Sequence, residues 1–511
     1  MRLYFLTPAL LLLGACSIES EPNPPPSTRF VYPSGVAFWR PPAAGGPAAS
    51  NGYLFLANAN FDNCYDSGSV MALNLEAMRT QQDGQAVALP HLGSALPDSA
   101  LAFEDLSSAQ ESLVQIRSFA GELGLWVNPA TGLPRLFVPS RAEGNNLNAV
   151  DVGLEAGGAP TLTCVQGGKD CRNGALSLTD DIPSSLSDEG RSGLPRAPSP
   201  IGVTVDDASG NLYVTHSEAA DSPAKSSKNF ESYLATVKLD NPTRDTLGFI
   251  PLSPNGFAYG GSDSVTVGAG YLYVTGRNFV AGVNGTVAAN FVLRLVDKNE
   301  TGIILEPSLK SVFRIREARA ARVVPRPVTA AELAARPNFV RERLYLLARG
   351  PDTLLTIDFE YDAVPGAAAT QPFFRVVSAV PMPDGVSDME LISRTPGTSN
   401  ADTNIIAVTS TGDSAVSLYD EALGQVVAQV PLVNNLNQTS NPSQAFGLTV
   451  DNPAGTNAAR MFVTNFGDSQ VAIVDIPDLA RPQDARLVAK LGIQQQRDPN
   501  QGTSVCQENR P

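Results

Sequence analysis

Histidine is the side chain most often used for proton transfer near neutral pH, so the two histidines among the 511 residues are the first candidates for chemistry. His216 ends the alternating segment "LYVTH", and His91 lies in the connecting segment "LPHLG". Neither is accompanied by a GxSxG nucleophile motif, a phosphate-binding loop or a GxGxxG turn after a strand. The meaning of His216 therefore depends on the element that carries it.

That element is one of seven similar segments. Each begins with an apolar pair and alternates as a strand between two packed neighbours would. The segments are "YLFLANA" (53–59), "RLFVPSR" (135–141), "NLYVTHS" (211–217), "YLYVTGR" (271–277), "RLYLLAR" (343–349), "IIAVTST" (405–411) and "RMFVTNF" (460–466). A shorter strand precedes each segment and a third follows it, with room for a fourth. The repeat predicts an all-β fold, a seven-bladed β-propeller of four-stranded antiparallel blades.

The segments "PIGVTVDDASGNLYVTH" and "QAFGLTVDNPAGTNAARMFVTNFGDSQVAIVDI" resemble the YVTN and NHL-type repeats of seven-bladed propellers, from about Pro33 to Asp475. Proteins with such repeats include envelope binding proteins and lactonase-type hydrolases that hold a divalent cation in the central channel. The resemblance therefore implies the fold and leaves the function open.

In such propellers the second strand of each blade climbs to the upper face, so seven equivalent positions meet there. They hold Asn58, Ser140, His216, Gly276, Ala348, Ser410 and Asn465, which do not form a ring of ligands. His216 is then either a binding residue or an isolated variant. One position later, three blades carry Arg141, Arg277 and Arg349. These arginines suit an anion-binding rim; the alternative is that each pairs with a neighbouring acid.

A metal-dependent hydrolase is the alternative function. Oxygen ligands for a cation such as Ca²⁺ would have to converge in the channel. The upper ends of the first strands offer Glu122, Asp263 and Asp388, from blades two, four and six. The other four starts are poor ligands, namely Ser34, Ile201, Ala320 and Phe446. The sequence therefore favours a binding or scaffolding protein over an enzyme, with no resident cofactor.

Long connections gather at the predicted upper face, in blades one, three and four and in the inter-blade segments 76–118 and 153–199. Elaboration on one side of a rigid scaffold predicts a recognition surface for a protein or a small ligand. The alternative is that loops accept insertions at low cost.

The first residues predict export. Arg2 precedes an apolar run to Leu13 that is too short for a membrane-spanning helix. Leu13, Gly14 and Ala15 before Cys16 resemble the lipobox of bacterial lipoproteins, which implies acylation of Cys16, and Ser17 after it implies sorting to the outer membrane. We expect a signal peptide (1–15), a proline-rich tether (16–29), the propeller (30–490) and a polar tail (491–511). Whether the protein faces the periplasm or the cell surface stays open.

Four further cysteines in an exported chain predict disulfides. Cys164 and Cys171 flank "VQGGKD", whose glycines allow the loop to turn back. Cys64 and Cys506, near the two ends of the folded region, form the second pair in the pairing that we favour, although three pairings are possible.

Helix is expected in two places. Residues 94–119 carry apolar residues at Leu106, Leu113 and Ile116, and residues 329–337 place Thr329 and Glu332 in capping-box spacing. The net charge of −15 disfavours nucleic acid and anionic membrane surfaces as partners. We expect a monomer.

Overall fold

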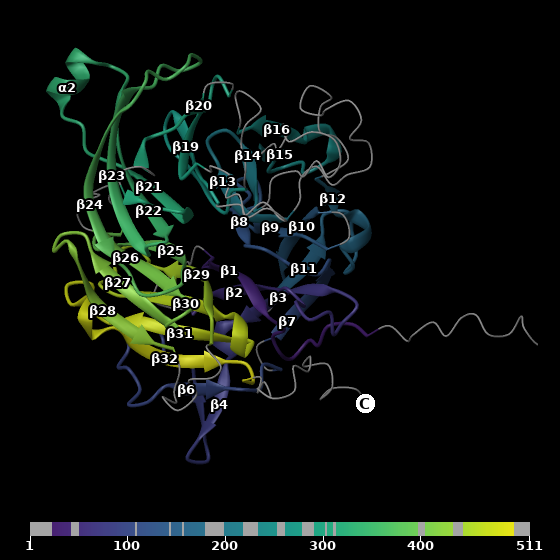
Figure 1. Cartoon of the computed structure of the whole chain (residues 1–511). Coiled ribbons are helices and arrows are strands. Elements are labelled where there is room, and N and C mark those ends of the chain that lie inside the picture. Colours follow the sequence, from purple (N-terminus) through teal and green to yellow (C-terminus); the bar gives the residue numbers. More distant parts are fainter. Residues whose placement is uncertain are drawn as a thin grey trace, which may run out of the picture.

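The computed structural model describes residues 23–41, 51–107, 110–142, 145–155, 158–178, 199–217, 233–252, 261–277, 291–301, 304–309, 313–396, 404–432 and 443–494. Seven antiparallel sheets surround a central channel (Figure 1), so the predicted seven-bladed β-propeller is confirmed.

The strands of each blade follow chain order from the channel outwards, and in blade one the outer strand β7 follows β3 after a long connection. The first three blades are β1 (Pro33–Trp39), β2 (Tyr53–Asn58), β3 (Gly68–Asn74) and β7 (Gln110–Ile116); β8 (Gly124–Val127), β9 (Pro134–Ser140), β10 (Asn146–Leu154) and β11 (Pro160–Cys164), with β12 (Leu176–Ser177) also on β10; and β13 (Pro200–Asp206), β14 (Asn211–His216), β15 (Tyr233–Lys238) and β16 (Gly248–Pro251).

The other four blades follow the same order. They are β17 (Val265–Val267), β18 (Tyr271–Thr275), β19 (Leu293–Asp297) and β20 (Ile304–Leu305); β21 (Glu317–Pro325), β22 (Phe339–Arg349), β23 (Thr353–Asp362) and β24 (Phe373–Pro381); β25 (Val386–Ser393), β26 (Asn404–Ser410), β27 (Ala415–Asp420) and β28 (Gln425–Pro431); and β29 (Ala445–Asp451), β30 (Ala459–Asn465), β31 (Gln470–Ile476) and β32 (Arg486–Leu491).

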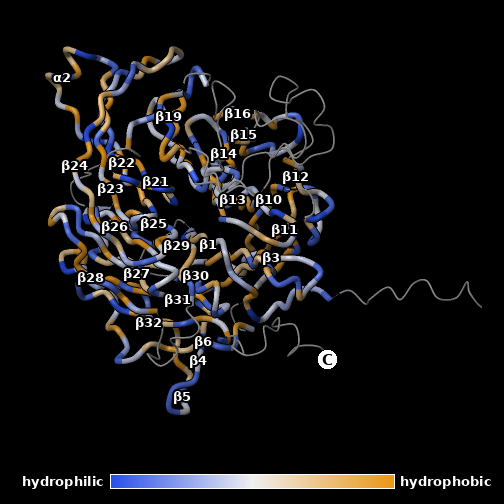
Figure 2. The backbone as a smooth tube through the Cα atoms, viewed as in Figure 1, coloured by the Kyte–Doolittle hydropathy of each residue, from blue (hydrophilic) through white to orange (hydrophobic). Residues whose placement is uncertain are grey.

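The core lies between blades. Among the described residues, seven buried hydrophobic clusters each join one pair of adjacent blades, including the last blade and the first. The alternating strands explain this arrangement, because each sheet turns one row of apolar side chains toward each neighbour. Figure 2 shows hydrophobic residues distributed along the strands, while the tip of β5 (Gln85–Ala88) is hydrophilic.

The ring is closed by contacts between blade seven and blade one. Phe38 of β1 stacks on Phe462 of β30 with ring centroids 5.1 Å apart, and Arg40 pairs with Asp451. In addition β6 (Leu101–Phe103), which belongs to the connection inside blade one, pairs in parallel with β32. The outer edge of the last blade is therefore covered by a segment from the first.

The helix that we expected within residues 94–119 is wrong. Residues 101–103 form β6, and residues 110–116 form β7, the outer strand of blade one. Leu106 and Ile116 are buried, as their apolar character suggested, but they pack in the hydrophobic clusters between blades rather than on one face of a helix. The second expectation is confirmed, since α2 (Ala330–Ala335) has Thr329 as its N-cap and Glu332 completing the capping box.

One local device recurs where the inner strands begin. The register between inner and second strand shifts near the upper end in blades one, three, five, six and seven. In blade six the Thr409 hydroxyl accepts from the Asp388 amide (3.0 Å) and donates to the carbonyl of Phe446 in blade seven (3.0 Å). Thr215 makes the same two contacts in blade three. The "VT" of the repeat therefore fixes a bulge, which re-aims nearby side chains into the channel.

Candidate functional site in the channel and at its upper mouth

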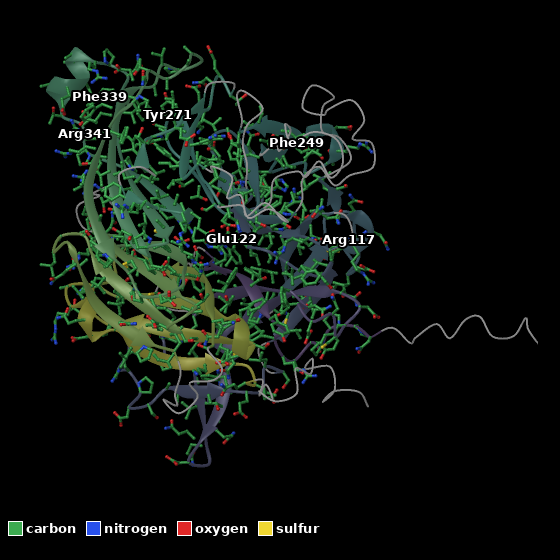
Figure 3. The ribbon with its side chains drawn as sticks, viewed as in Figure 1. Arg117, Glu122, Phe249, Tyr271, Phe339 and Arg341 are labelled. Carbon is green, nitrogen blue, oxygen red and sulfur yellow. A yellow bond between two sulfur atoms is a disulfide. The ribbon has the colours of Figure 1, made fainter. Side chains whose placement is uncertain are left out.

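The channel contains a polar cavity of about 200 Å³. Its lining comes from the inner strands of blades one, two, three, five, six and seven. The charged side chains that face it are Glu122, Arg322, Asp388 and Glu390. Glu122 lies near the centre of the ring (Figure 3).

Arg322 links two of the carboxylates, since its Nη2 lies 2.7 Å from Glu390 Oε1 and 3.4 Å from Asp388 Oδ1. Asp388 also accepts from the amides of Met389 (2.8 Å) and Leu448 (3.1 Å). The channel therefore holds a fixed arginine–carboxylate network that spans blades five, six and seven.

Glu122 is the least compensated carboxyl in this cavity, because its one hydrogen bond among the described residues is a 3.4 Å contact from the Val203 amide to Oε2. Burial raises the pKa of Glu122 to about 8, and the negative charge of Asp388 adds to this, while Arg322 partly offsets it. Burial likewise raises the pKa of Asp388 to about 6, against the opposing charge of Arg322. Glu122 is therefore mostly protonated at neutral pH and can donate a hydrogen bond into the cavity.

A second charged group lies at the upper end of the channel, which we call the upper mouth. Asp263 accepts from Arg319 through Oδ2 and from Arg277 through Oδ1 (3.3 Å). The carbonyl oxygens of Val386 and Gly385 accept from Arg349, at 2.6 Å and 3.2 Å, and Glu317 lies 3.9 Å from its Nη1. Burial lowers the pKa of Arg349, and the positive charge of Arg319 adds to this.

The candidate binding residues thus have different surroundings. Arg277 and Arg349 both approach the group around Arg319 and Asp263, whereas Arg141 belongs to blade two, where its amide donates to the Phe119 carbonyl. His216 is 2 % exposed and lies opposite Pro200 at the end of β14. Arg319 was not predicted from the sequence, because Ala320 was taken as the start of the inner strand of blade five. Ala318 pairs with Ala348, so counting onward from Ala318 gives Arg319 as the next residue.

The three carboxylates considered for a cation do not fit one. Asp263 is bound by two guanidinium groups and Asp388 by a third, and these positive charges would repel a divalent ion. Within the described ranges, no group of three or more His, Cys, Asp or Glu side chains is arranged to hold a metal.

Aromatic side chains form a second feature of the upper mouth, which the sequence did not reveal. Phe466, which follows β30, lies 5.2 Å from Tyr32, 5.6 Å from Phe61 and 5.9 Å from Phe446 between ring centroids. Phe119 meets Phe61 edge-on at 5.5 Å. We call Tyr32, Phe61, Phe119, Phe446 and Phe466 the aromatic cluster. Its members come from blades one, two and seven; Phe446 lies near the start of β29, and the other four follow or precede strands at the upper face.

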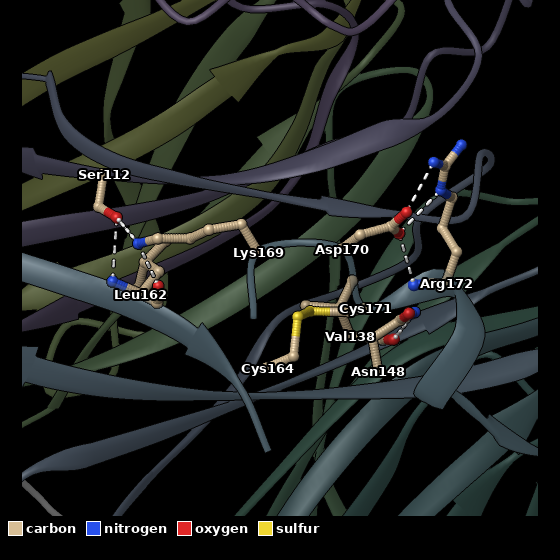
Figure 4. The surroundings of a disulfide bond; sticks show 9 residues. All are labelled: Ser112, Val138, Asn148, Leu162, Cys164, Lys169, Asp170, Cys171 and Arg172. Atoms are coloured by element: carbon tan, nitrogen blue, oxygen red, sulfur yellow. Dashed lines mark hydrogen bonds and ion pairs between the residues drawn. A yellow bond between two sulfur atoms is a disulfide. The ribbon is translucent and has the colours of Figure 1, made fainter. Parts of the chain in front are cut away.

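The predicted disulfide between Cys164 and Cys171 is confirmed (Figure 4). Gly167 and Gly168 between them have φ values of 95° and 79°, which only glycine adopts readily. Lys169 in the same loop donates to Ser112 Oγ (2.9 Å) and Leu162 O (2.6 Å). The loop therefore fastens blade two to the outer strand of blade one.

The remaining cysteines are described only in part. Cys64 is disulfide-bonded, whereas Cys506 and the expected lipidation site Cys16 lie outside the described residues, so both of those expectations stay predictions. Among the described helices, none is long and apolar enough to cross a membrane. Residues 23–29 of the expected tether run beside the loop after β2, where the Asn23 side chain donates to the Cys64 carbonyl.

No family model matches the chain, and no curated protein matches it. The chain is similar to a number of solved structures at low sequence identity, three of which are as follows. Apo AztD from Citrobacter koseri is 11 % identical, with 91 % of this chain and 94 % of that chain covered and a TM-score of 0.37. Kuenenia stuttgartiensis hydrazine synthase is 12 % identical (84 % and 93 % covered, TM-score 0.37). Chaetomium thermophilum Sqt1, bound to the N-terminus of ribosomal protein L10, is 10 % identical (91 % and 89 % covered, TM-score 0.38). Similarity this distant carries no argument about function, so the function must be argued from the site itself.

Proposed function

We propose that the protein is a lipid-anchored binding protein of the bacterial outer membrane, which recognises its ligand or partner at the upper mouth of the propeller. The observation that carries the proposal is the composition of that mouth. An aromatic cluster with one half-exposed phenylalanine stands beside a group of partly buried arginines. Aromatic and arginine side chains are the residues that most often dominate binding surfaces.

The channel supports binding better than catalysis. A hydrolase would need a nucleophile, or a metal with an adjacent base. Instead Asp263, Asp388 and Glu390 form ion pairs with Arg277, Arg319 and Arg322, so these carboxylates serve mainly to hold neighbouring blades together. No observation favours the metal-dependent hydrolase.

Anchoring at Cys16 completes the proposal. The apolar run ending at Cys16 supports export and acylation, and several acyl chains on one cysteine would hold a protein at a membrane stably. The ring would then present its upper mouth while remaining attached to the membrane.

Photo-cross-linking in intact cells tests the proposal. A benzophenone amino acid replaces Phe61 at the mouth, and a control protein carries it at Phe373, a still more exposed phenylalanine on β24. We expect a discrete cross-linked species, protein or small molecule, from position 61 only. Identical products from both positions would contradict recognition at the mouth. A stoichiometric metal in the purified protein, together with lactone hydrolysis, would favour the hydrolase instead.

A further inference from the structure

Phe61 stands out from the aromatic cluster because its side chain is 50 % exposed while its ring packs against three others. The loop that presents it is built rather than loose. The buried Asn60 side chain donates to the Tyr65 carbonyl (2.7 Å) and to Ser118 Oγ (2.9 Å), and accepts from the Tyr65 amide (3.1 Å). An aromatic ring held in place above other rings has little conformational entropy left to lose on binding.

The backbone beneath the cluster is strained. Tyr32 and Phe119 occupy equivalent positions, just before the inner strands of blades one and two, and both have positive φ (51° and 58°). Bulky side chains rarely adopt this conformation, and such outliers gather at functional sites. At the same position blade three has Ser199 and blade seven has Gln444, also with positive φ. Of these four equivalent positions, only the two in blades one and two, next to Phe61, carry aromatic side chains.

The arginines of the mouth lie next to the cluster. Gly385, Val386 and Ser387 separate them, because the first two accept from Arg349 while the hydroxyl of Ser387 donates to the carbonyl of Phe446 (3.1 Å). Phe446 of the aromatic cluster and the guanidinium group of Arg349 therefore contact the same short segment, residues 385–387 at the start of β25.

The guanidinium groups on the arginine side are not all tightly paired. Arg277 and Arg319 share Asp263, whereas Arg349 has Glu317 at a loose 3.9 Å and the charge of Asp352 nearby. Partly buried guanidinium groups attract carboxylate, sulfonate or phosphate groups, with which they form paired hydrogen bonds. The side chain of Arg319 is 10 % exposed and that of Arg349 is 27 % exposed, so the acidic group must be slender enough to enter the channel.

We propose that the upper mouth binds a small organic anion with an aromatic or flat apolar body, the body lying against the aromatic cluster, of which Phe61 is the exposed member, and the acidic group reaching Arg349 and its neighbours. The inference rests on the proposed function and names its ligand class. A folded protein partner fits less well, because its side chains would have to reach recessed guanidinium groups across a protruding Phe61.

The test uses two fluorescent probes with the same ring system. 1-Anilinonaphthalene-8-sulfonate carries an acidic group, and N-phenyl-1-naphthylamine lacks it. The proteins are wild type, Phe61→Ala, Arg349→Gln and the control Phe373→Ala, each checked for native near-ultraviolet circular dichroism. We expect one sulfonate probe per chain, with the Kd raised about fivefold or more by Phe61→Ala and by Arg349→Gln, as loss of about 1 kcal/mol of contact would give. The uncharged probe should weaken with Phe61→Ala alone, and Phe373→Ala should change neither.

Arg277→Gln is the second arginine variant, which serves if Arg349→Gln does not fold. Unchanged sulfonate binding in Phe61→Ala, or an equal loss of both probes in a folded arginine variant, would overturn the ligand class. If cross-linking from position 61 captures a protein while the probes ignore Phe61, the proposed function stands and the small-anion assignment is wrong.

Discussion

Arg460 and Asp475 form a two-contact ion pair, with Nε to Oδ1 at 2.7 Å and Nη2 to Oδ2 at 2.8 Å, in which each side chain is only 1 % exposed. Both residues belong to blade seven, and the same guanidinium reaches blade one by donating to Asn51 Oδ1 (3.2 Å) and the Pro90 carbonyl (2.9 Å). The pair therefore satisfies the desolvated charges of one blade while joining it to the next.

Replacing Arg460 alone should destabilise the ring strongly. Arg460→Met leaves the Asp475 carboxylate buried without its cation, so we expect a loss of about 3–5 kcal/mol in the free energy of unfolding, measured by urea denaturation. The double variant Arg460→Met, Asp475→Leu removes both charges and should recover much of that loss. A double variant no more stable than the single one would show that the contacts to blade one, rather than the pair, carry the stability.

The raised pKa of Glu122 predicts a pH dependence. The folded state keeps its proton up to about pH 8, whereas the unfolded chain loses it near 4.5, the ordinary pKa of a glutamate side chain. The contribution of Glu122 is therefore fully present below about pH 4.5 and is lost as pH rises toward 8, with a slope of up to about 1.4 kcal/mol per pH unit. Glu122→Gln should flatten this part of the stability profile, while Glu104→Gln, at an exposed site, should not. Parallel profiles for Glu122→Gln and wild type would contradict the assignment.

The Cys164–Cys171 disulfide closes a short loop, so its removal should have a moderate effect. Cys164→Ala, Cys171→Ala is expected to lower the free energy of unfolding by about 2–3 kcal/mol, because the released loop gains entropy in the unfolded chain. Alanine is preferred to serine because both positions are buried. Oxidised and reduced wild type, compared in the same denaturant series, provide the control, and equal stabilities there would argue against this role.

Peptide mapping without reduction should find Cys64 joined to Cys506. Cys64 is disulfide-bonded, Cys164 and Cys171 pair with each other, and an acylated Cys16 would have its sulfur in a thioether. A Cys64–Cys16 peptide would contradict both the pairing and the lipid anchor, and a free Cys64 thiol in envelope extracts would contradict the pairing alone.

Lipidation predicts a change of compartment. Wild-type protein grown with labelled palmitate should carry label and sediment with membranes, whereas Cys16→Ser should be unlabelled and either soluble or unprocessed. Ser17→Asp keeps the cysteine and alters only the sorting position, so it should stay labelled. Label that persists in Cys16→Ser would place the acyl group elsewhere.

The seven-fold repeat made the strands readable from sequence, because each blade repeats the alternation of its neighbours. The site was harder to read. Arg319 stands on a bulge where two residues of the inner strand oppose one of the second strand, so counting along the chain placed Ala320 there instead. Register is set by pairing across the strands, which a single segment does not display.

The aromatic cluster and the helix error share another cause. Tyr32, Phe61, Phe119, Phe446 and Phe466 are far apart in sequence, and only ring closure makes them neighbours. Leu106, Leu113 and Ile116 suggested a helix because their spacing suits one face of it, yet residues 110–116 pair with β3 and residues 101–103 pair with the last blade. Propensity within one segment does not include such distant partners.

The pairing of β6 with β32 also constrains how the molecule is made. Residues 101–103 leave the ribosome early but find their partner only when residues 489–491 have been synthesised. Until then the backbone groups of residues 101–103 lack their partners, and the apolar side chains of blade one that face blade seven are uncovered. Exposed strand edges and exposed apolar surface promote aggregation. A chain that stops short of β32 loses both the outer strand of the last blade and its pairing with β6, so the ring can be completed only after β32 has been synthesised.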